Sequence, residues 1–392
     1  MPHSSRSVAP QEVPEGVDFV NSAAALRRLA RAIRGASLLA VDTEAASFHR
    51  FKDRVYLLQV STRERTAVID PLAVEDLSPI GAMLADPKIE IVFHDADFDL
   101  RLLDRDFHFK VVNVFDTRIG AQFINEPAVG LAALLSKHLG VTLDKKFQRA
   151  DWSARPLSPE MITYAAMDTR FLPQLRDILR ERLSEAARLD WAREEFQLLE
   201  RVRWATRGNG KDAYLKMKGA KALKGRPLAV LRELYRWRDR TARRVDRAPF
   251  RILNNEPLLA LAKSPPADLE GLSAFRGVGR ETVSRNGRDI LKAIDRGLAL
   301  PAEQIPIIAR PTRPPPDVAF DARIDRLKSA RNRLARKLEL PPGVVCPNGT
   351  LEAIARTKPK TIAGLKRVPG VRGWQAQEFG EELLVEIEPA QS

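Results

Sequence analysis

Four acidic residues and one tyrosine in the first half of the chain have the types and spacing of a metal-dependent nuclease site. Asp42 and Glu44 form an Asp-x-Glu pair, Asp99 lies in a second acidic segment, and Tyr164 precedes Asp168 by four residues. Hard divalent cations prefer carboxylate oxygens, and two such ions about 3.5–4 Å apart can hold both oxygens of an in-line phosphoryl displacement. A tyrosine hydroxyl, with an ordinary pKa of about 10, is a weak base that suits orienting an attacking water.

The first two acidic segments are predicted to lie at the ends of strands. The apolar run 38–41 is typical of a buried strand. Asp42 and Glu44 follow it, and since side chains two apart on a strand share a face, they should project together. Residues 90–93 predict a second strand. A helix should begin after it, with Asp99 in its first turn.

The third segment is predicted to be a helix that opens at Pro159. Tyr164 and Asp168 are i and i+4 on that helix and therefore neighbours on one face. Four converging carboxylates without cations would repel one another severely, so a metal site explains the cluster better than a structural role. The alternative for the second segment alone is a solvated loop and helix cap.

These motifs resemble the DEDD exonuclease superfamily in its tyrosine-bearing branch and, within it, the ribonuclease D family. Phe93-His94 with Asp99-Leu100 is similar to that family's second motif, and Phe115-Asp116-Thr117 to its Asp-Thr element. Residues 146–158 are similar to the segment that leads into its third motif. The resemblance covers about residues 22–183, and the C-terminal half also fits.

The resemblance implies a role for each residue and a reaction. Asp42 would bridge two divalent metal ions, Mg²⁺ or Mn²⁺. Glu44 and Asp168 would complete the water-activating site, Asp99 would serve the second ion, and Tyr164 would orient the nucleophile. The reaction implied is hydrolysis from an RNA 3′ end that releases 5′-mononucleotides. The implied substrates are tRNA precursors or other structured RNA with a 3′ tail.

The chain departs from the family directly after the first motif. Ribonuclease D usually has an aromatic residue there, whereas this chain has Ala45, and the nearest aromatic residue is Phe48. Phe48 or His49 could take over the contact with the terminal nucleotide. The candidate RNA-binding residues are Phe48, His94, Gln148, Arg149, Lys216, Lys218, Lys221, Lys224, Arg243 and Arg244.

Charge divides the chain into two halves. Residues 1–190 hold 25 Lys+Arg and 27 Asp+Glu, a net charge of −2, whereas residues 191–392 hold 40 and 24, a net charge of +16. Within 201–250 alone there are 16 basic and 4 acidic residues. Clustered positive charge indicates a nucleic-acid partner. A solvated basic surface is the alternative, and an anionic membrane surface is a weaker one.

Composition excludes several classes of protein. No apolar run approaches the ~18 residues needed to span a bilayer, and an apolar fraction of 44% supports folded cores. The single Cys346 excludes an intramolecular disulfide framework and a cysteine-based zinc finger. These features predict a cytoplasmic protein without a membrane partner, and no feature indicates an obligate protein partner.

The second half repeats itself at a constant offset of 93 residues, which indicates two copies of one unit. The pairs include Leu234 with Leu327, Arg238 with Arg331, Ala242 with Ala335, Asn255 with Asn348, Leu258 with Leu351, Gly277 with Gly370, Gly287 with Gly380 and Leu291 with Leu384. Each copy has the spacing of a small helical bundle and resembles the HRDC domain. The first copy is the more basic, because 341–346 replaces the basic segment 247–251 in the second.

The expected architecture is an α/β RNase H-like 3′→5′ exonuclease domain, with a mixed sheet and flanking helices, followed by two all-α HRDC-like domains. Strands are expected near Leu38–Thr43, Tyr56–Ser61, Thr66–Ile69, Ile91–His94 and Val111–Phe115. The expected divisions are a disordered tail 1–16, the exonuclease domain 17–200, a basic linker 201–226, the first HRDC-like domain 227–302, a Pro-rich linker 303–317 and the second HRDC-like domain 318–388.

The function expected from the sequence is that of a metal-dependent 3′→5′ exoribonuclease, whose acidic half does the chemistry while the basic half holds the RNA. Two alternatives remain open. One is a 3′→5′ DNA exonuclease of the same superfamily, since the sequence does not show which sugar the site accepts. The other is a non-catalytic RNA-binding protein that retains the fold.

Overall fold

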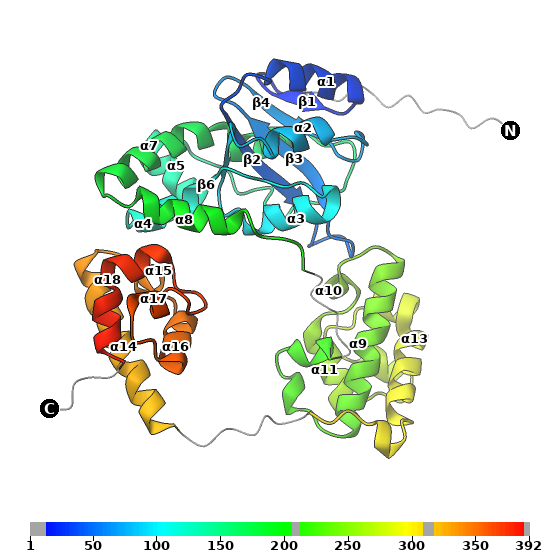
Figure 1. Cartoon of the computed structure of the whole chain (residues 1–392). Helices are drawn as coiled ribbons and strands as arrows, with labels where there is room; N and C mark the ends of the chain where they lie inside the picture. Colours follow the sequence, from blue (N-terminus) through cyan, green and yellow to red (C-terminus); the bar gives the residue numbers. More distant parts are fainter. Residues whose placement is uncertain (1–12, 206–211, 309–316, 388–392) are drawn as a thin grey trace.

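The computed structural model describes residues 13–205, 212–308 and 317–387, which form one α/β region and two helical regions (Figure 1). Most of the tail expected at 1–16, and parts of both expected linkers, lie outside the described residues. The α/β architecture followed by helical regions confirms the predicted fold class. The exact domain boundaries stay a prediction.

The N-terminal region is built on a six-stranded mixed sheet in the order β1-β4-β3-β2-β5-β6. Strands β2, β5 and β6 run parallel, as do β1 and β4, while β3 is antiparallel to both of its neighbours. The strands are β1 (Asp18–Val20), β2 (Leu38–Ala45), β3 (Val55–Ser61), β4 (Thr66–Ile69), β5 (Glu90–Phe93) and β6 (Val114–Asp116).

Two strands differ from the sequence prediction. The expected strand from Val111 is wrong at its start, because Asn113 has a φ of 54°, a left-handed conformation that interrupts extended backbone. Val111 is apolar because it packs in the core beside the sheet. The sequence also missed β1, an edge strand of only three residues, which is too short for alternation of apolar and polar residues to reveal it.

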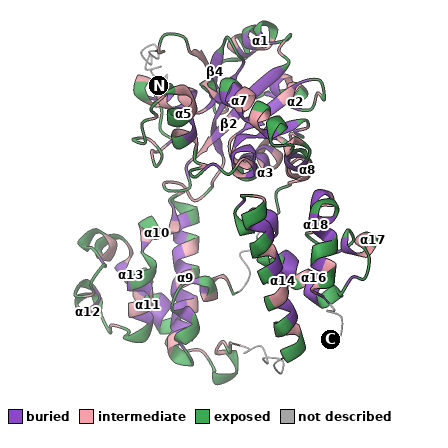
Figure 2. Ribbon diagram, turned by 90° about the vertical axis from the view of Figure 1, so that its left-hand side faces the viewer, coloured by how far each residue is buried: buried purple, intermediate pink, exposed green. Residues whose placement is uncertain are grey.

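Helices cover both faces of the sheet, and alternate residues of β2 show the two cores. Leu39 and Val41 pack with α1 (Ala23–Ala32), α2 (Ser78–Leu84) and α3 (Asp97–Phe107), whereas Leu38 and Ala40 pack on the opposite side. The helices of the opposite side are α4 (Thr117–Phe123), α5 (Leu131–Leu139), α6 (Pro159–Arg170), α7 (Leu172–Glu185) and α8 (Leu189–Leu199). Figure 2 shows the strands buried between these layers.

The two helical regions confirm the predicted repeat. The first contains α9 (Arg226–Arg244), α10 (Pro249–Ile252), α11 (Asn255–Lys263), α12 (Leu269–Ser273) and α13 (Arg280–Leu298). The second contains α14 (Val318–Lys337), α15 (Pro342–Val345), α16 (Asn348–Thr357), α17 (Ile362–Leu365) and α18 (Gly373–Val385). Helices α10 to α13 each begin 93 residues before their counterparts α15 to α18.

Two of the repeated residue pairs have the same structural task in both copies. Arg238 donates to the side chain of Asn255 at 2.7 Å, and Arg331 donates to Asn348 at 2.6 Å. Each arginine thereby fixes the start of the third helix of its bundle. These two identities of the repeat therefore belong to residues that hold helices together.

Part of the segment expected as a basic linker packs into the first helical region. Tyr214, Met217, Ala220 and Leu223 are buried in the same core as α9. Tyr214 and Ala220 belong to two short 3₁₀ helices, η1 (Ala213–Lys216) and η2 (Ala220–Ala222), and Met217 and Leu223 directly follow them. The apolar residues between the lysines pack against α9. The sequence analysis considered only the charges of this segment and therefore did not predict this packing.

The second helical region docks on α8 of the exonuclease region. The Trp374 ring stacks on the Trp191 ring, with centroids 4.6 Å apart and planes 15° apart. The Glu194 carboxylate accepts hydrogen bonds from the backbone N–H groups of Gly373 and Trp374, the first residues of α18. A carboxylate at a helix N-terminus meets unpaired N–H groups and the positive end of the helix dipole, so this contact stabilises the junction.

No helix in the described residues has the length and the apolar character needed to cross a membrane.

Candidate active site

The predicted acidic residues of β2 and α6 come together. Asp42, Glu44 and Asp168 each place one carboxylate oxygen within 4.8 Å of the other two. Asp42 and Glu44 project from the same face of β2, as the strand alternation predicted. Helix α6 brings Asp168 to that face. At the other end of this helix, Ser158 is the N-cap and accepts a hydrogen bond from Met161 N–H at 3.3 Å.

Asp99 lies in the first turn of α3, as predicted, and its charge acts on Asp42 and Glu44, but it is not among the three acids whose oxygens lie within 4.8 Å of one another. Its Oδ1 accepts hydrogen bonds from the Thr43 backbone N–H, at 3.1 Å, and from the Thr43 hydroxyl. Thr43 lies between the two acids of β2 and points to the opposite face of the strand. The sequence pattern did not identify Thr43, although the position between the acids of an Asp-x-Glu strand is the one that faces α3.

Asp116 and Thr117 secure the ends of the strands beside the site. Asp116 accepts hydrogen bonds from the N–H of Ala96, at 2.7 Å, and from two N–H groups at the start of α4. The Thr117 hydroxyl donates to the Phe93 carbonyl at 3.0 Å. The Asp-Thr element therefore fixes the turn between β5 and α3, which sets the position of Asp99.

The electrostatics of the acidic cluster favour cation binding. Burial and the neighbouring Asp99, Asp168 and Glu44 hold the pKa of Asp42 well above its ordinary value. Burial and the other acids likewise raise the pKa of Glu44. Burial raises the pKa of Asp99 and that of Asp168 to about 7. Such carboxylates are costly to ionise together without a positive charge, and their donor atoms are all oxygens, so the set fits hard divalent cations.

Tyr164 lies beside the cluster with its ring held between aromatic neighbours. Its centroid is 5.9 Å from that of Trp152, which is buried, and 5.8 Å from that of Phe147. Burial and the nearby carboxylates, Asp168 first among them, raise the pKa of Tyr164. The hydroxyl therefore stays protonated at neutral pH and can donate a hydrogen bond.

A hollow of about 340 Å³ opens onto Tyr164 and Asp168. Its opposite wall is the segment 142–147. The hollow therefore exposes the α6 side of the acidic cluster.

The predicted RNA-binding residues lie in three places. Phe48 is 45% exposed, and the guanidinium of Arg149 lies 5.3 Å from its ring centre. His94 is partly buried, its Nδ1 is 2.9 Å from the Thr117 hydroxyl, and burial lowers its pKa to about 4. The remaining candidates, Gln148, Lys216, Lys218, Lys221, Lys224, Arg243 and Arg244, are exposed. Their role in RNA binding stays a prediction.

Comparison with known proteins agrees with this geometry. A 3′-5′ exonuclease family model matches residues 17–184, and an HRDC domain model matches residues 228–294 and 320–387. The chain is 31% identical to a ribonuclease D of Gluconacetobacter diazotrophicus over 90% of its own length and 88% of that protein. It is 33% identical to an exosome complex component 10 homolog of Caenorhabditis elegans, but spans only 33% of that longer protein.

Solved structures show the same relationship. The crystal structure of Escherichia coli RNase D, an exoribonuclease involved in structured RNA processing, superposes with a TM-score of 0.67 at 26% identity and covers 95% of this chain and 99% of that chain. The catalytic core of RRP6 from Trypanosoma brucei superposes with a TM-score of 0.64 at 28% identity over 74% of this chain and 81% of that chain.

Fold and site together define a 3′→5′ exonuclease with appended HRDC domains. The chain belongs to the ribonuclease D family. It is a 3′→5′ exoribonuclease, as the sequence predicted, and the superfamily to which it belongs uses divalent metal ions.

Proposed function

We propose that this enzyme trims the 3′ ends of structured RNA, tRNA precursors included, with two divalent metal ions, Mg²⁺ or Mn²⁺, and releases 5′-mononucleotides. The observation that carries the proposal is the meeting of Asp42, Glu44 and Asp168 within 4.8 Å. Its substrate class is supported by the E. coli relative, which is described as acting in structured RNA processing.

The carboxylates have separate tasks in this proposal. Asp42, Glu44 and Asp168 would hold the divalent ions, and Asp99, in the first turn of α3, would complete the ligand set. The bound ions would supply the hydroxide nucleophile and stabilise the leaving oxygen. Thr43 keeps Asp99 oriented through its two hydrogen bonds, so the carboxylate needs little rearrangement when a cation binds.

Tyr164 supplies an oriented hydrogen bond. Because its pKa is raised, it does not act as an anionic base near neutral pH. Its hydroxyl instead holds the attacking water in line with the scissile phosphodiester. The packing of its ring against Trp152 and Phe147 limits rotation, which is the pre-organisation that such positioning requires.

The test is hydrolysis of a 5′-labelled RNA stem that carries a single-stranded 3′ tail. With Mg²⁺ or Mn²⁺ we expect a ladder that shortens from the 3′ end, and with EDTA we expect intact RNA. Asp42→Ala should abolish hydrolysis and leave RNA binding largely unchanged. Retained hydrolysis by the purified variant would contradict the site assignment. A tail with a 3′-terminal deoxyribose would show whether the site requires the ribose 2′-hydroxyl.

A further inference from the structure

The loop that follows β2 connects the active site to the first helical region. Residues 46–54 leave the strand directly after the Asp-x-Glu pair. The His49 carbonyl accepts a hydrogen bond from Ala248 N–H at 3.1 Å, and the Phe48 carbonyl accepts one from the Arg251 side chain. The α9–α10 corner therefore lies against the loop of the catalytic region, as Figure 1 also shows.

Two exposed phenylalanines meet at this contact, one from each region. The rings of Phe48 and Phe250 lie edge to face with centroids 6.3 Å apart, and the side chains are 45% and 43% exposed. The guanidinium of Arg149 lies over the Phe48 ring, and Phe147, two residues earlier, lines the hollow beside Tyr164. Arg149, Phe48 and Phe250 thus form a cationic and aromatic cluster between the catalytic region and α10.

A hollow lined by arginines continues this surface. It has a volume of about 270 Å³ and lies between the end of α9, α10 and the start of α13. Arg244, Arg247, Arg251 and Arg285 line it, with Glu281 as the acidic residue of the lining. The lining therefore has an excess of three positive charges. In the described part of the chain, neither Arg244 nor Arg247 has a carboxylate within ion-pair distance.

The neutral lining of this hollow also suits an anion. Thr241, Thr282 and Asn286 contribute side chains that can donate hydrogen bonds. Thr282 lies in the first turn of α13, whose N-cap residue Gly279 provides no side-chain cap. The first N–H groups of this 19-residue helix therefore remain available to a phosphate oxygen.

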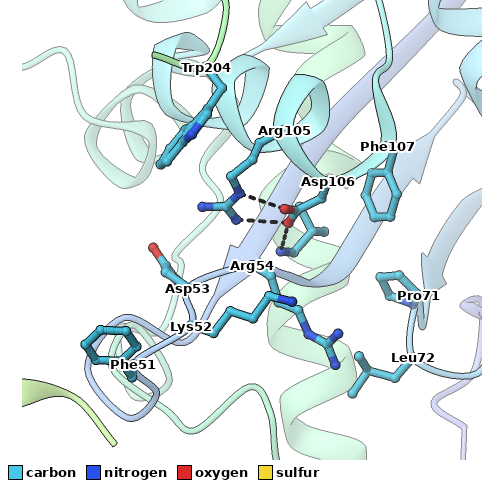
Figure 3. Close-up of a pocket in the computed structure, with 11 residues that line it drawn as sticks. Phe51, Lys52, Asp53, Arg54, Pro71, Leu72, Arg105, Asp106, Phe107 and Trp204 are labelled. Atoms are coloured by element: carbon cyan, nitrogen blue, oxygen red, sulfur yellow. Dashed lines mark hydrogen bonds and ion pairs between the residues drawn. The ribbon is translucent and has the colours of Figure 1, made fainter. Parts of the chain in front are cut away.

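A larger hollow on the other side of the 46–54 loop has a different character. Its volume is about 670 Å³ (Figure 3). The guanidinium of Arg105 forms two hydrogen bonds to Asp106, at 2.6 and 2.9 Å, and stacks on Trp204. The charge of Arg105 is thus balanced by Asp106, and the lining also holds Lys52, Arg54 and Asp53, so its excess is one positive charge. The arginine hollow on the first helical region is the better phosphate site.

We propose that the Phe48–Phe250 pair and the arginine hollow form one binding site, across the two regions, for the RNA strand on the 5′ side of the scissile nucleotide. This inference rests on the proposed function, since it names where the substrate of that active site continues. Bases stack on exposed aromatic rings, while arginines hold successive phosphates. The site thereby selects single strands long enough to reach from the acidic cluster to α13.

Substrate length provides the test. A dinucleotide occupies only the active site, whereas a single strand of about twelve nucleotides also reaches the hollow. Binding of the long RNA is measured by titration at several salt concentrations, with all variants in an Asp42→Asn background that prevents hydrolysis. Hydrolysis of both RNAs is then measured with Mg²⁺ in the otherwise unchanged enzyme.

The variants are Phe250→Ala and the double variant Arg244→Ala/Arg247→Ala. The double variant keeps the hydrogen bonds that Ala248 and Arg251 make to the 46–54 loop. We expect each to weaken binding of the long RNA about tenfold. The arginine variant should also reduce the slope of log K against log salt by roughly 1.4, the value for two phosphate contacts on a single strand. Hydrolysis of the dinucleotide should change less than about twofold. Arg296→Ala is the matched control, because Arg296 is exposed near the far end of α13.

Three outcomes would overturn the proposal. One is unchanged binding and salt slope for the long RNA. The second is an equal loss of dinucleotide hydrolysis, which would place the defect in the active site. The third is an equal effect of Arg296→Ala, which would show only general charge attraction. If the long RNA binds as expected but is not hydrolysed with any metal, the proposed function fails while this binding site stands.

Discussion

Asp168→Asn should stabilise the metal-free protein at pH 8, because burial makes the ionised form of the Asp168 carboxyl group unfavourable. Its pKa is about 7 in the folded chain against 3.8 as the ordinary value. The folded chain therefore retains a proton that the unfolded chain releases between these values. The free energy of unfolding of the metal-free protein thus decreases as the pH rises from about 4 to about 7.

The size of this effect follows from the same two values. One pKa unit corresponds to about 1.4 kcal/mol, so the difference for Asp168 corresponds to at most about 4 kcal/mol at pH 8. Because the clustered acids share protons, we expect the substitution to recover about 1–4 kcal/mol. For a region of this size that is an increase in the melting temperature of about 2–16 °C.

The assay is thermal unfolding in EDTA at pH 5 and pH 8, and again with Mg²⁺ at pH 8. The difference in melting temperature between variant and wild type should be small at pH 5 and large at pH 8. Mg²⁺ should raise the melting temperature of the wild type and have little effect on the variant. Asp177→Asn is the control. Arg63 lowers the pKa of Asp177, so this carboxylate is ionised at both pH values and its substitution should change the melting temperature equally at both. A variant no more stable than the wild type at pH 8 would refute the reasoning.

Two further changes test the parts that position the site. Tyr164→Phe should lower kcat about ten- to a hundredfold and leave the Kd for RNA unchanged, because the hydroxyl orients the water rather than the strand; an equal rise in Kd would contradict this. Arg155→Met should destabilise the protein by about 3–5 kcal/mol in urea unfolding. Arg155, in the segment before α6, donates two hydrogen bonds, at 2.6 and 2.8 Å, to the Asp70 carboxylate, which is only 6% exposed. The substitution leaves that buried charge without them. Restored stability in Asp70→Asn/Arg155→Met would confirm that the uncompensated charge is the cause.

The local arrangement of the site could be predicted because strand and helix periods fix which side chains share a face. The alternation of β2 placed Asp42 with Glu44, and the i,i+4 spacing placed Tyr164 with Asp168. The meeting of the segments in space depends on contacts between residues far apart in the chain. Thr43 was not foreseen as the residue that holds Asp99, because strand alternation places it on the face opposite the two acids but does not show which element packs there.

In the helical half, too, patterns along the chain were predictable, whereas contacts between folded regions were not. The offset of 93 residues predicted two copies of one helical unit, and the starts of α10 to α13 and of α15 to α18 keep that offset. The pairing of Phe48 with Phe250 could not be predicted, because it depends on how two folded regions dock. The lysine-rich segment was interpreted as a linker, although Tyr214 and Met217 pack into a core. Charge patterns describe the surface and not the apolar residues between the charges.

The stacked Trp191 and Trp374 rings give this protein an optical property. The indoles are nearly parallel, with centroids 4.6 Å apart, and they come from α8 and α18, on opposite sides of the junction between the exonuclease region and the second helical region. Two chromophores this close couple electronically, so their near-ultraviolet circular dichroism and emission depend on their contact. Undocking of the C-terminal region would change both signals before the rest of the chain unfolds. Whether RNA binding changes this docking can therefore be measured from the intrinsic tryptophan signals, without an attached dye.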